Sequence, residues 1–174
     1  MSWRVLGAKG TGKAIFEAAL VLARMPYECA EDATEQGLLL PDGTLMTESA
    51  AIILYIDGLV PELGLVPNVR DPLRREMLRW LMFLVAAINP AYGKSDQGRP
   101  DDEVMPLWRL VEGAVRGPWF LGDVPSALDL YVSVMTRWSP GRAWFADCCP
   151  RLYAVATTVD VDPRLVRVWA ANFA

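Results

Sequence analysis

Residues 40–52 read LPDGTLMTESAAI, and this stretch decides the fold. An apolar run ends at the turn-forming triplet Pro41-Asp42-Gly43, and a second apolar run follows at once, which predicts a β-hairpin. Glu48 and Ser49 then precede a run of alanine, isoleucine and leucine, which predicts the start of a helix. The stretch therefore predicts two antiparallel strands that lead directly into a helix.

The segment before this hairpin predicts a strand, a helix and a second strand. Residues 3–6 form a short apolar strand that ends at a glycine, and the glycine-rich turn over residues 10–12 opens a segment whose apolar residues have helical spacing. Pro26 ends that helix, and residues 27–30 can form the next strand. The helix after the hairpin is expected to run from Thr47 or Glu48 to Gly58, where glycine ends it.

The rest of the chain predicts helices only. Residues 59–70 hold two prolines, a glycine and an asparagine, which favours a linker between a first domain at 1–58 and a helical domain at 71–174. A polar loop is expected over residues 93–102. The expected helices are 73–88 (ended by Asn89-Pro90), 103–116, 126–138 (opened by a capping box of Ser126 and Asp129), 150–159 and 163–171.

The composition excludes several classes of function. The formal charge of -4 argues against a nucleic-acid partner, because phosphate binding needs clustered cations. The chain has no histidine, and its three cysteines form no C-x-x-C motif, so we expect neither a metal site nor a histidine-based triad. The longest strongly apolar run, residues 80–88, is far shorter than the roughly 20 residues of a membrane span, and the N-terminus lacks a signal-peptide pattern. These features predict a cytoplasmic protein with reduced thiols and no membrane partner.

Two stretches resemble signatures of the glutathione S-transferase family. Residues 40–52 are similar to the hairpin that leads into Glu/Gln-Ser and Ala-Ile, and residues 120–129, FLGDVPSALD, are similar to the Ser-x-x-Asp cap of a core helix. The element order fits as well, so the resemblance covers nearly the whole chain. It implies a truncated thioredoxin-like N-terminal domain of α+β class, followed by an all-α C-terminal domain. It also implies glutathione as co-substrate and a homodimer.

The resemblance implies that glutathione binds where the hairpin meets the helix. The hydroxyl and backbone N–H of Ser49 at a helix N-terminus favour a carboxylate, which in the family is the γ-glutamyl carboxylate of glutathione. Glu48 would lie near the ammonium group of the same ligand. The alternative is that residues 47–49 only cap the helix. The Ser126 and Asp129 cap is expected to be structural.

The sulfur of glutathione is expected at the turn between the first strand and the first helix. Thr11 would hydrogen-bond the thiolate, and the charge of Lys13 with the N–H groups of Gly12 and Lys13 would stabilise it. This chain lacks the Tyr, Cys or Ser of many family members, so the alternative is a plain turn with a solvent-facing lysine. Residues 7–13 also fit the phosphate-loop pattern G-x-x-x-x-G-K, but Ala14 replaces the magnesium-binding Ser or Thr, which makes nucleotide binding the weaker hypothesis.

The chain also departs from the family. Only residues 28–41 lie between Tyr27 and the Asp-Gly turn, too few for two strands and an average helix of about 11 residues, so we expect that one helix is missing. The resemblance also implies a Val-Pro pair whose valine clamps the cysteinyl part of glutathione, but here Leu38 or Leu39 follows Gly37 with no proline. Leu39 is the candidate glutathione-binding residue, and the site is expected to lack one wall.

The resemblance implies an apolar substrate pocket lined by aromatic residues. The alternative is that these aromatic residues only fill the core. Its candidate residues are Phe83, Tyr92 and Trp108. Two functions stay open. One is a glutathione transferase that conjugates or reduces a small electrophile, and the other is a non-catalytic binding or interaction protein with the same fold.

Overall fold

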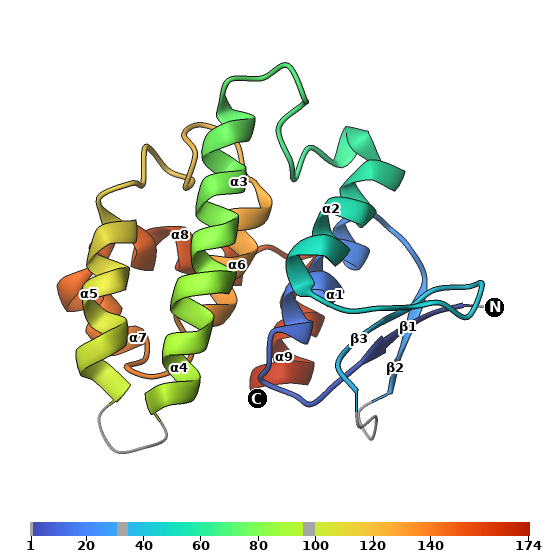
Figure 1. Cartoon of the computed structure of the whole chain (residues 1–174), viewed down its shortest axis with the longest axis horizontal. Helices are drawn as coiled ribbons and strands as arrows, with labels where there is room; N and C mark the ends of the chain where they lie inside the picture. Colours follow the sequence, from blue (N-terminus) through green and yellow to red (C-terminus); the bar gives the residue numbers. More distant parts are fainter. Residues whose placement is uncertain (1, 31–34, 96–99) are drawn as a thin grey trace. The chain divides into compact units, whose positions relative to one another are not determined.

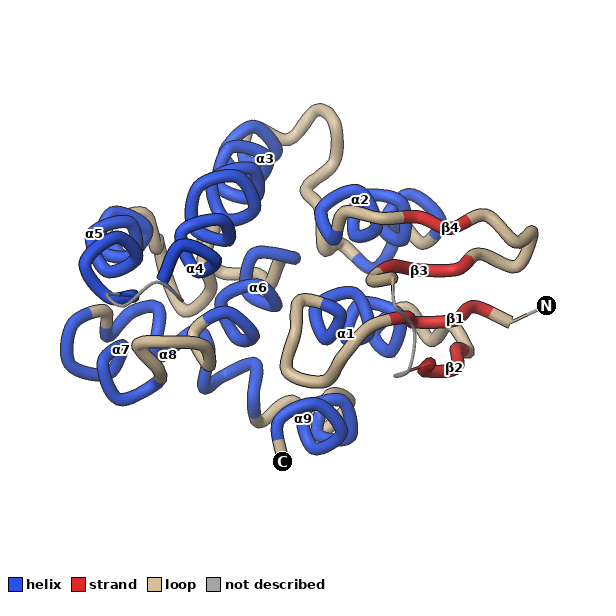
Figure 2. Tube along the Cα trace, turned by 60° about the horizontal axis from the view of Figure 1, so that its bottom comes forward, coloured by secondary structure: helices blue, strands red, loops and turns tan. Residues whose placement is uncertain are grey.

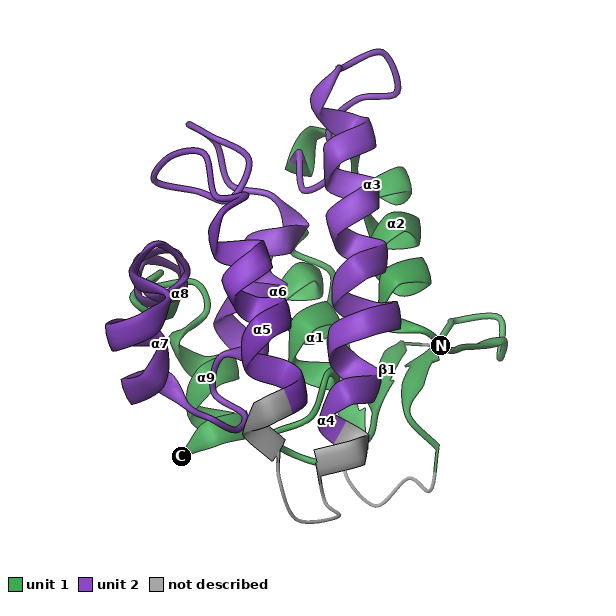
Figure 3. Ribbon diagram, turned by 60° about the vertical axis from the view of Figure 1, so that its left-hand side comes forward, with its two compact units in different colours: residues 1–63, 160–174 green, residues 64–159 purple. Residues whose placement is uncertain are grey.

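The computed structural model describes residues 2–30, 35–95 and 100–174, with the backbone alone at 93–95 and 100–102 (Figure 1). The chain divides into two compact units, coloured separately in Figure 3. Unit 1 comprises residues 1–63 and 160–174, and unit 2 comprises residues 64–159. Unit 1 is therefore assembled from both ends of the sequence.

Unit 1 is built on a four-stranded mixed sheet with the strand order β2-β1-β3-β4 (Figure 2). Strand β1 (Trp3–Leu6) pairs in parallel with β2 (Tyr27–Ala30) and antiparallel with β3 (Gly37–Leu39). Strand β4 (Leu45–Met46) completes the hairpin with β3. The predicted order of strand, helix, strand and hairpin is confirmed.

Helices α1 (Lys13–Leu22) and α2 (Ser49–Leu59) form the core of unit 1 with the sheet. The two helices contact each other, α1 contacts β1, and α2 contacts β3. Val5 and Leu38 lie directly opposite each other on β1 and β3, and both are fully buried. The short helix η1 (Pro61–Leu63) follows α2, and helix α9 (Val166–Phe173) returns to unit 1 and contacts α1 (Figure 1).

The truncation predicted from the sequence is present in this sheet. Only residues 31–36 connect β2 to β3, which is about half the length of an average helix. The chain thus has the thioredoxin-like strand order without room for the helix that would join these strands. The fold class is confirmed.

Unit 2 is entirely helical, and its interior is apolar. Trp108, Phe120 and Tyr131 are among its largest fully buried side chains. In the residues described, no helix combines the length and the apolar character needed to cross a bilayer. The helices of unit 2 are α3 (Leu73–Phe83), η2 (Leu84–Ile88), α4 (Asn89–Ser95), α5 (Pro100–Glu112), α6 (Ala127–Met135), α7 (Arg142–Cys148) and α8 (Pro150–Asp160).

Asn89 and Pro90 do not end the first helix of unit 2, so this expectation was wrong. The helix continues into α4 through η2, a five-residue π-helical turn directly before Asn89. A π-turn shifts the hydrogen bonds by one residue, and this local change can accommodate a proline ring and its missing N–H. The expected polar loop is correspondingly shorter, since 93–95 and 100–102 are helical and 96–99 lie outside the described residues.

The capping box of α6 is confirmed. The carboxylate of Asp129 accepts hydrogen bonds from Ser126 N at 2.6 Å, Ser126 Oγ at 3.1 Å and Phe120 N at 2.7 Å. Burial raises the pKa of Asp129 to about 6, although these three bonds act in the opposite direction. The cap therefore joins the loop before α6 to the first turn of the helix.

Candidate functional site

The start of α2 has an unusual backbone conformation. Glu48 has φ of +63° and ψ of 104°, which side chains other than glycine rarely adopt. Its carbonyl accepts the N–H of Ile52 at 3.0 Å, so Glu48 begins the helix, and Ser49 is the first helical residue. In the residues described, the Glu48 side chain makes no capping hydrogen bond and is exposed. This argues against capping as the reason for a glutamate here.

The turn between β1 and α1 surrounds the hydroxyl of Thr11. Thr11 Oγ1 donates to the carbonyl of Ala8 at 2.7 Å and accepts from the Gln36 amide at 3.0 Å. The N–H of Lys13 lies 3.4 Å from the same oxygen. A thiolate would therefore have to compete with the Ala8 carbonyl for the hydroxyl proton.

No pattern in the sequence indicates that Gln36 lies in this turn. The side chain arrives because Gly37 pairs with Leu6 at the end of β1, which brings Gln36 over the turn. A Cβ atom placed on Gly7 would lie 3.0 Å from Gln36 Cγ, and Gly7 has φ of +129°. A glycine at this position thus allows both the turn and the close approach of Gln36.

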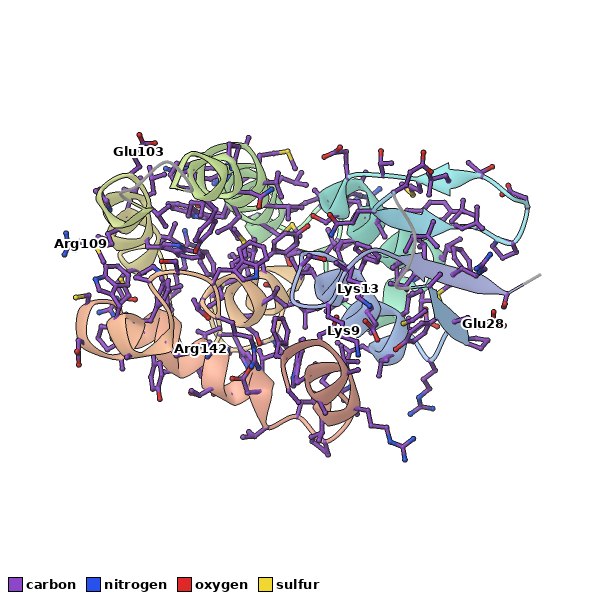
Figure 4. The ribbon with its side chains drawn as sticks, turned by 90° about the horizontal axis from the view of Figure 1, so that it is seen from below. Lys9, Lys13, Glu28, Glu103, Arg109 and Arg142 are labelled. Carbon is purple, nitrogen blue, oxygen red and sulfur yellow. The ribbon has the colours of Figure 1, made fainter. Side chains whose placement is uncertain are left out.

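Lys13 is buried, which contradicts the alternative of a plain turn with a solvent-facing lysine. Only 2% of the residue is exposed, and its Nζ lies 3.7 Å from Glu17 Oε2. The Lys13 side chain is labelled in Figure 4. A buried ammonium needs a nearby negative charge, and Glu17 supplies one a helical turn away. The charge that the sequence assigned to a thiolate is thus balanced inside unit 1, and the catalytic role of Lys13 stays a prediction.

Glu17 is the centre of a polar network that the sequence did not reveal, because its members lie far apart along the chain. Tyr27 OH donates to Glu17 Oε1 at 3.0 Å, Cys29 Sγ lies 3.6 Å from the same oxygen, and Asn172 Nδ2 donates to Oε2 at 2.9 Å. Burial and then the charge of Glu17 raise the pKa of Tyr27 far above its usual range, so its hydroxyl stays protonated.

Leu39 lies inside the sheet, opposite Arg4 on β1 and Leu45 on β4. Because strands flank it on both sides, its N–H and C=O face a neighbouring strand whichever way they point. Within the described sheet, this residue therefore offers no free backbone edge to clamp a peptide, as the family's valine does.

Of the expected pocket residues, the structure brings two together. Trp108 Nε1 donates to Tyr92 OH at 2.8 Å, and Tyr92 OH donates to the carbonyl of Met135 at 3.1 Å. Trp108 is fully buried, and Phe83 packs edge to face on Trp80, with ring centroids 5.5 Å apart. Tyr92 and Trp108 satisfy each other's polar atoms inside unit 2, which favours a structural role for this pair.

Comparison with known proteins finds relatives that match nearly the whole chain or about 59% of it. No protein-family model matches the chain. The chain is 28% identical to the uncharacterized GST-like protein YncG of Escherichia coli (strain K12), over 97% of this chain and 98% of that protein. That alignment has 203 positions, more than the 174 residues of this chain, so YncG contains residues that this chain lacks. Identity to glutathione S-transferase GST-4.5 of Xanthomonas campestris pv. campestris is 30%, over 59% of this chain and 58% of that protein.

Solved structures match the whole chain. A glutathione transferase homolog from Sulfitobacter with bound glutathione superimposes with a TM-score of 0.83 at 19% identity, over 99% of each chain. A sphingomonad glutathione S-transferase complexed with glutathione gives a TM-score of 0.83 at 20% identity, over 98% of this chain and 100% of that chain. At these identities the superpositions establish the fold.

Proposed function

Because the chain belongs to the glutathione S-transferase family, we propose that it binds glutathione at the start of α2 and transfers it to, or reduces with it, a small electrophile. The observation that carries this proposal is the strained backbone of Glu48, directly before Ser49 and the 11-residue helix α2. A conformation that costs about 1–3 kcal/mol persists where function requires it.

The start of α2 has the chemistry that an α-amino acid group requires. The hydroxyl and N–H of Ser49 are donors for a carboxylate, and the helix dipole adds to that attraction. The exposed carboxylate of Glu48 is a partner for the ammonium group beside it. The γ-glutamyl end of glutathione carries both groups.

The sulfur of glutathione would lie at the turn that contains Thr11 and Gly12. The Thr11 hydroxyl, the N–H groups of Gly12 and Lys13, and the amide of Gln36 beside Thr11 are the donors for a thiolate. Since Glu17 balances the charge of Lys13, these neutral donors would carry most of the stabilisation. The thiol proton is lost to solvent when the thiolate forms. The thiolate sulfur then bonds to the electrophilic carbon of the substrate, which releases its leaving group.

A glutathione titration tests the binding step. A ligand at about 100 times its Kd adds about 2.7 kcal/mol of stability, which raises the melting temperature by several degrees in a chain of this size. We expect this rise in the wild type and in the control Ser2→Ala, which removes another serine hydroxyl of unit 1, and no rise in Ser49→Ala. An unchanged melting temperature of the wild type would contradict the proposal.

A turnover assay distinguishes the two functions that stay open, an enzyme and a non-catalytic binding protein. The position of Leu39 inside the sheet favours the second possibility, because the cysteinyl part of glutathione then lacks a backbone clamp. The assay follows displacement of chloride from 1-chloro-2,4-dinitrobenzene by the glutathione sulfur. Binding without turnover on such aryl halides and on organic peroxides would assign the chain to the non-catalytic class.

We extend the proposal to a cytoplasmic homodimer. The support is the family membership, whose soluble members commonly pair, and the apolar residues exposed on the chain, such as Leu59 on α2 and Leu110 on α5. Light scattering after size-exclusion chromatography gives the mass in solution. A monomer at micromolar concentration would contradict this part of the proposal.

A further inference from the structure

Unit 1 contains a cavity that includes none of the residues of the proposed glutathione site. Its volume is about 630 Å³, within the range of pockets that hold small molecules. Helix α1, strand β2 and the segment Pro163–Ala171 line it, and all three belong to unit 1. Figures 1 and 2 show α9 beside α1 in this unit.

The floor of the cavity is polar, buried and already neutral. Glu17, which is 3% exposed, forms part of it, and its carboxylate is paired with Lys13 and hydrogen-bonded to Tyr27 and Asn172. Asn172 also donates to the carbonyl of Val168 at 2.9 Å, so the same residue anchors α9 to α1. The floor therefore has fixed geometry and no unbalanced negative charge that would select a cation.

The walls and the mouth have a different character. Val21, Val168 and Ala171 give the cavity apolar walls, while Arg164 and Arg167 give it two guanidinium groups. Asp162 holds Arg164 through two parallel bonds, with Nε to Oδ1 at 3.0 Å and Nη2 to Oδ2 at 2.6 Å. The side chain of Arg167 is exposed and has no ion pair or hydrogen bond with any residue that the structure describes.

The charges around the cavity do not cancel. Lys13 balances Glu17, Arg164 balances Asp162, and the guanidinium of Arg167 remains. Tyr27, which also lines the cavity, donates its hydroxyl proton to Glu17, so its oxygen can serve a ligand only as an acceptor. The site thus combines apolar walls, one available cation and one acceptor.

We propose that this cavity binds a small amphipathic carboxylate, with the carboxylate on Arg167 and an alkyl or aryl body against Val21, Val168 and Ala171. A planar guanidinium can bind a carboxylate through two hydrogen bonds, which makes arginine a suitable partner. The site differs from the proposed glutathione site in every lining residue, so both ligands can be bound together.

The test uses 4-butylbenzoate and isothermal titration calorimetry on the full chain. Arg167→Gln is expected to weaken binding of 4-butylbenzoate about tenfold, because one charge-assisted contact is lost. The uncharged 4-butylbenzamide is expected to bind the wild type as weakly as 4-butylbenzoate binds the Arg167→Gln variant. The control Arg75→Gln, which removes an exposed arginine of unit 2, is expected to bind like the wild type. Equal melting temperatures show that the variants are folded.

Filling the cavity gives a second, independent test. Ala171→Trp places a large ring among the lining residues and is expected to abolish binding, whereas Ala170→Trp changes the exposed neighbour outside the lining and is expected to leave binding intact. Saturating glutathione is expected to leave the affinity for 4-butylbenzoate unchanged. Three results would overturn the proposal. They are a wild type that does not bind millimolar probe, unchanged binding by both Arg167→Gln and Ala171→Trp, and competition between the probe and glutathione.

Discussion

At the scale of single residues, the backbone of Glu48 is a testable link between strain and function. Glycine adopts φ of +63° without the steric cost that glutamate has there, and it is nearly as good as polar residues before a helix. We therefore expect Glu48→Gly to raise the free energy of unfolding by about 1 kcal/mol and to weaken glutathione binding, because the partner of the ammonium group is lost. Urea unfolding and a glutathione titration measure the two effects.

Glu48→Ala is the matched control for this substitution. Alanine also removes the carboxylate but keeps the Cβ atom, so it should weaken glutathione binding without the gain in stability. If Glu48→Gly destabilises the chain as much as Glu48→Ala does, the φ value of Glu48 carries no strain.

Lys13 and Glu17 form the other decisive pair of residues. Both are almost fully buried, so removing one charge leaves the other without a partner in a medium of low polarity. We expect Lys13→Met to lower the free energy of unfolding by about 3 kcal/mol, and the double variant with Glu17→Gln to lose clearly less. Urea unfolding of the wild type, the two single variants and the double variant measures the coupling. A double variant that loses the sum of both single effects would show that the ion pair is not coupled.

At the scale of secondary structure, the start of α6 depends on Asp129 more than on Ser126. Replacing Ser126 with alanine removes one capping hydroxyl and is expected to cost about 1 kcal/mol. Asp129→Ala leaves the N–H groups of Phe120 and Ser126 without their acceptor in the interior, so we expect a loss of about 3 kcal/mol. Denaturant unfolding measures the free energy of unfolding of Ser126→Ala and Asp129→Ala. Equal losses in the two variants would contradict this ranking.

The sequence predicted the elements whose signals are local. The Pro-Asp-Gly turn, the Glu48-Ser49 helix start and the Ser126/Asp129 cap each need only a few neighbouring residues, and the structure contains all three. Asn89-Pro90 misled because proline disfavours a regular helix, while a π-turn before it depends on the packing of the whole helix. Helix α7 (Arg142–Cys148) was missed because its seven residues make fewer than two helical turns, too short a stretch for a clear apolar periodicity.

In the candidate site, too, the sequence indicates residues with local signals and misses those that long-range contacts bring together. Glu48 and Ser49 could be found because they are neighbours in a known motif. Gln36 reaches Thr11 only through the pairing of β3 with β1, and Glu17 meets Asn172 across 155 positions of sequence. Lys13 is buried as well, and no local pattern in the sequence indicates that burial.

At the scale of the whole molecule, the two units are joined through the chain in two places. The sequence passes from unit 1 to unit 2 after residue 63 and returns after residue 159. Helix α8 (Pro150–Asp160) runs without interruption up to this second boundary, and α9 then completes unit 1. Because unit 2 is inserted between the two segments of unit 1, so that the chain crosses the boundary twice, we infer that the two units unfold together.

The cysteines can measure this cooperativity. Cys29 in unit 1 and Cys148 in unit 2 are exposed, whereas Cys149 is fully buried, and burial followed by the charge of Glu112 raises its pKa to about 12. At about pH 8 we therefore expect two thiols to react quickly with a disulfide reagent and Cys149 to react only when unit 2 opens. Mass spectrometry of the labelled chain measures the extent of labelling at each cysteine.

Substitutions in each unit then decide whether opening is global. Asp129→Ala lies in unit 2 and should accelerate the labelling of Cys149 in any case. If the chain opens as one body, Lys13→Met in unit 1 should accelerate it as well, by roughly a hundredfold for a loss of about 3 kcal/mol. A labelling rate that Lys13→Met leaves unchanged, while it lowers the stability of unit 1, would show that unit 2 opens by itself. The two chain connections after residues 63 and 159 would then not transmit unfolding between the units.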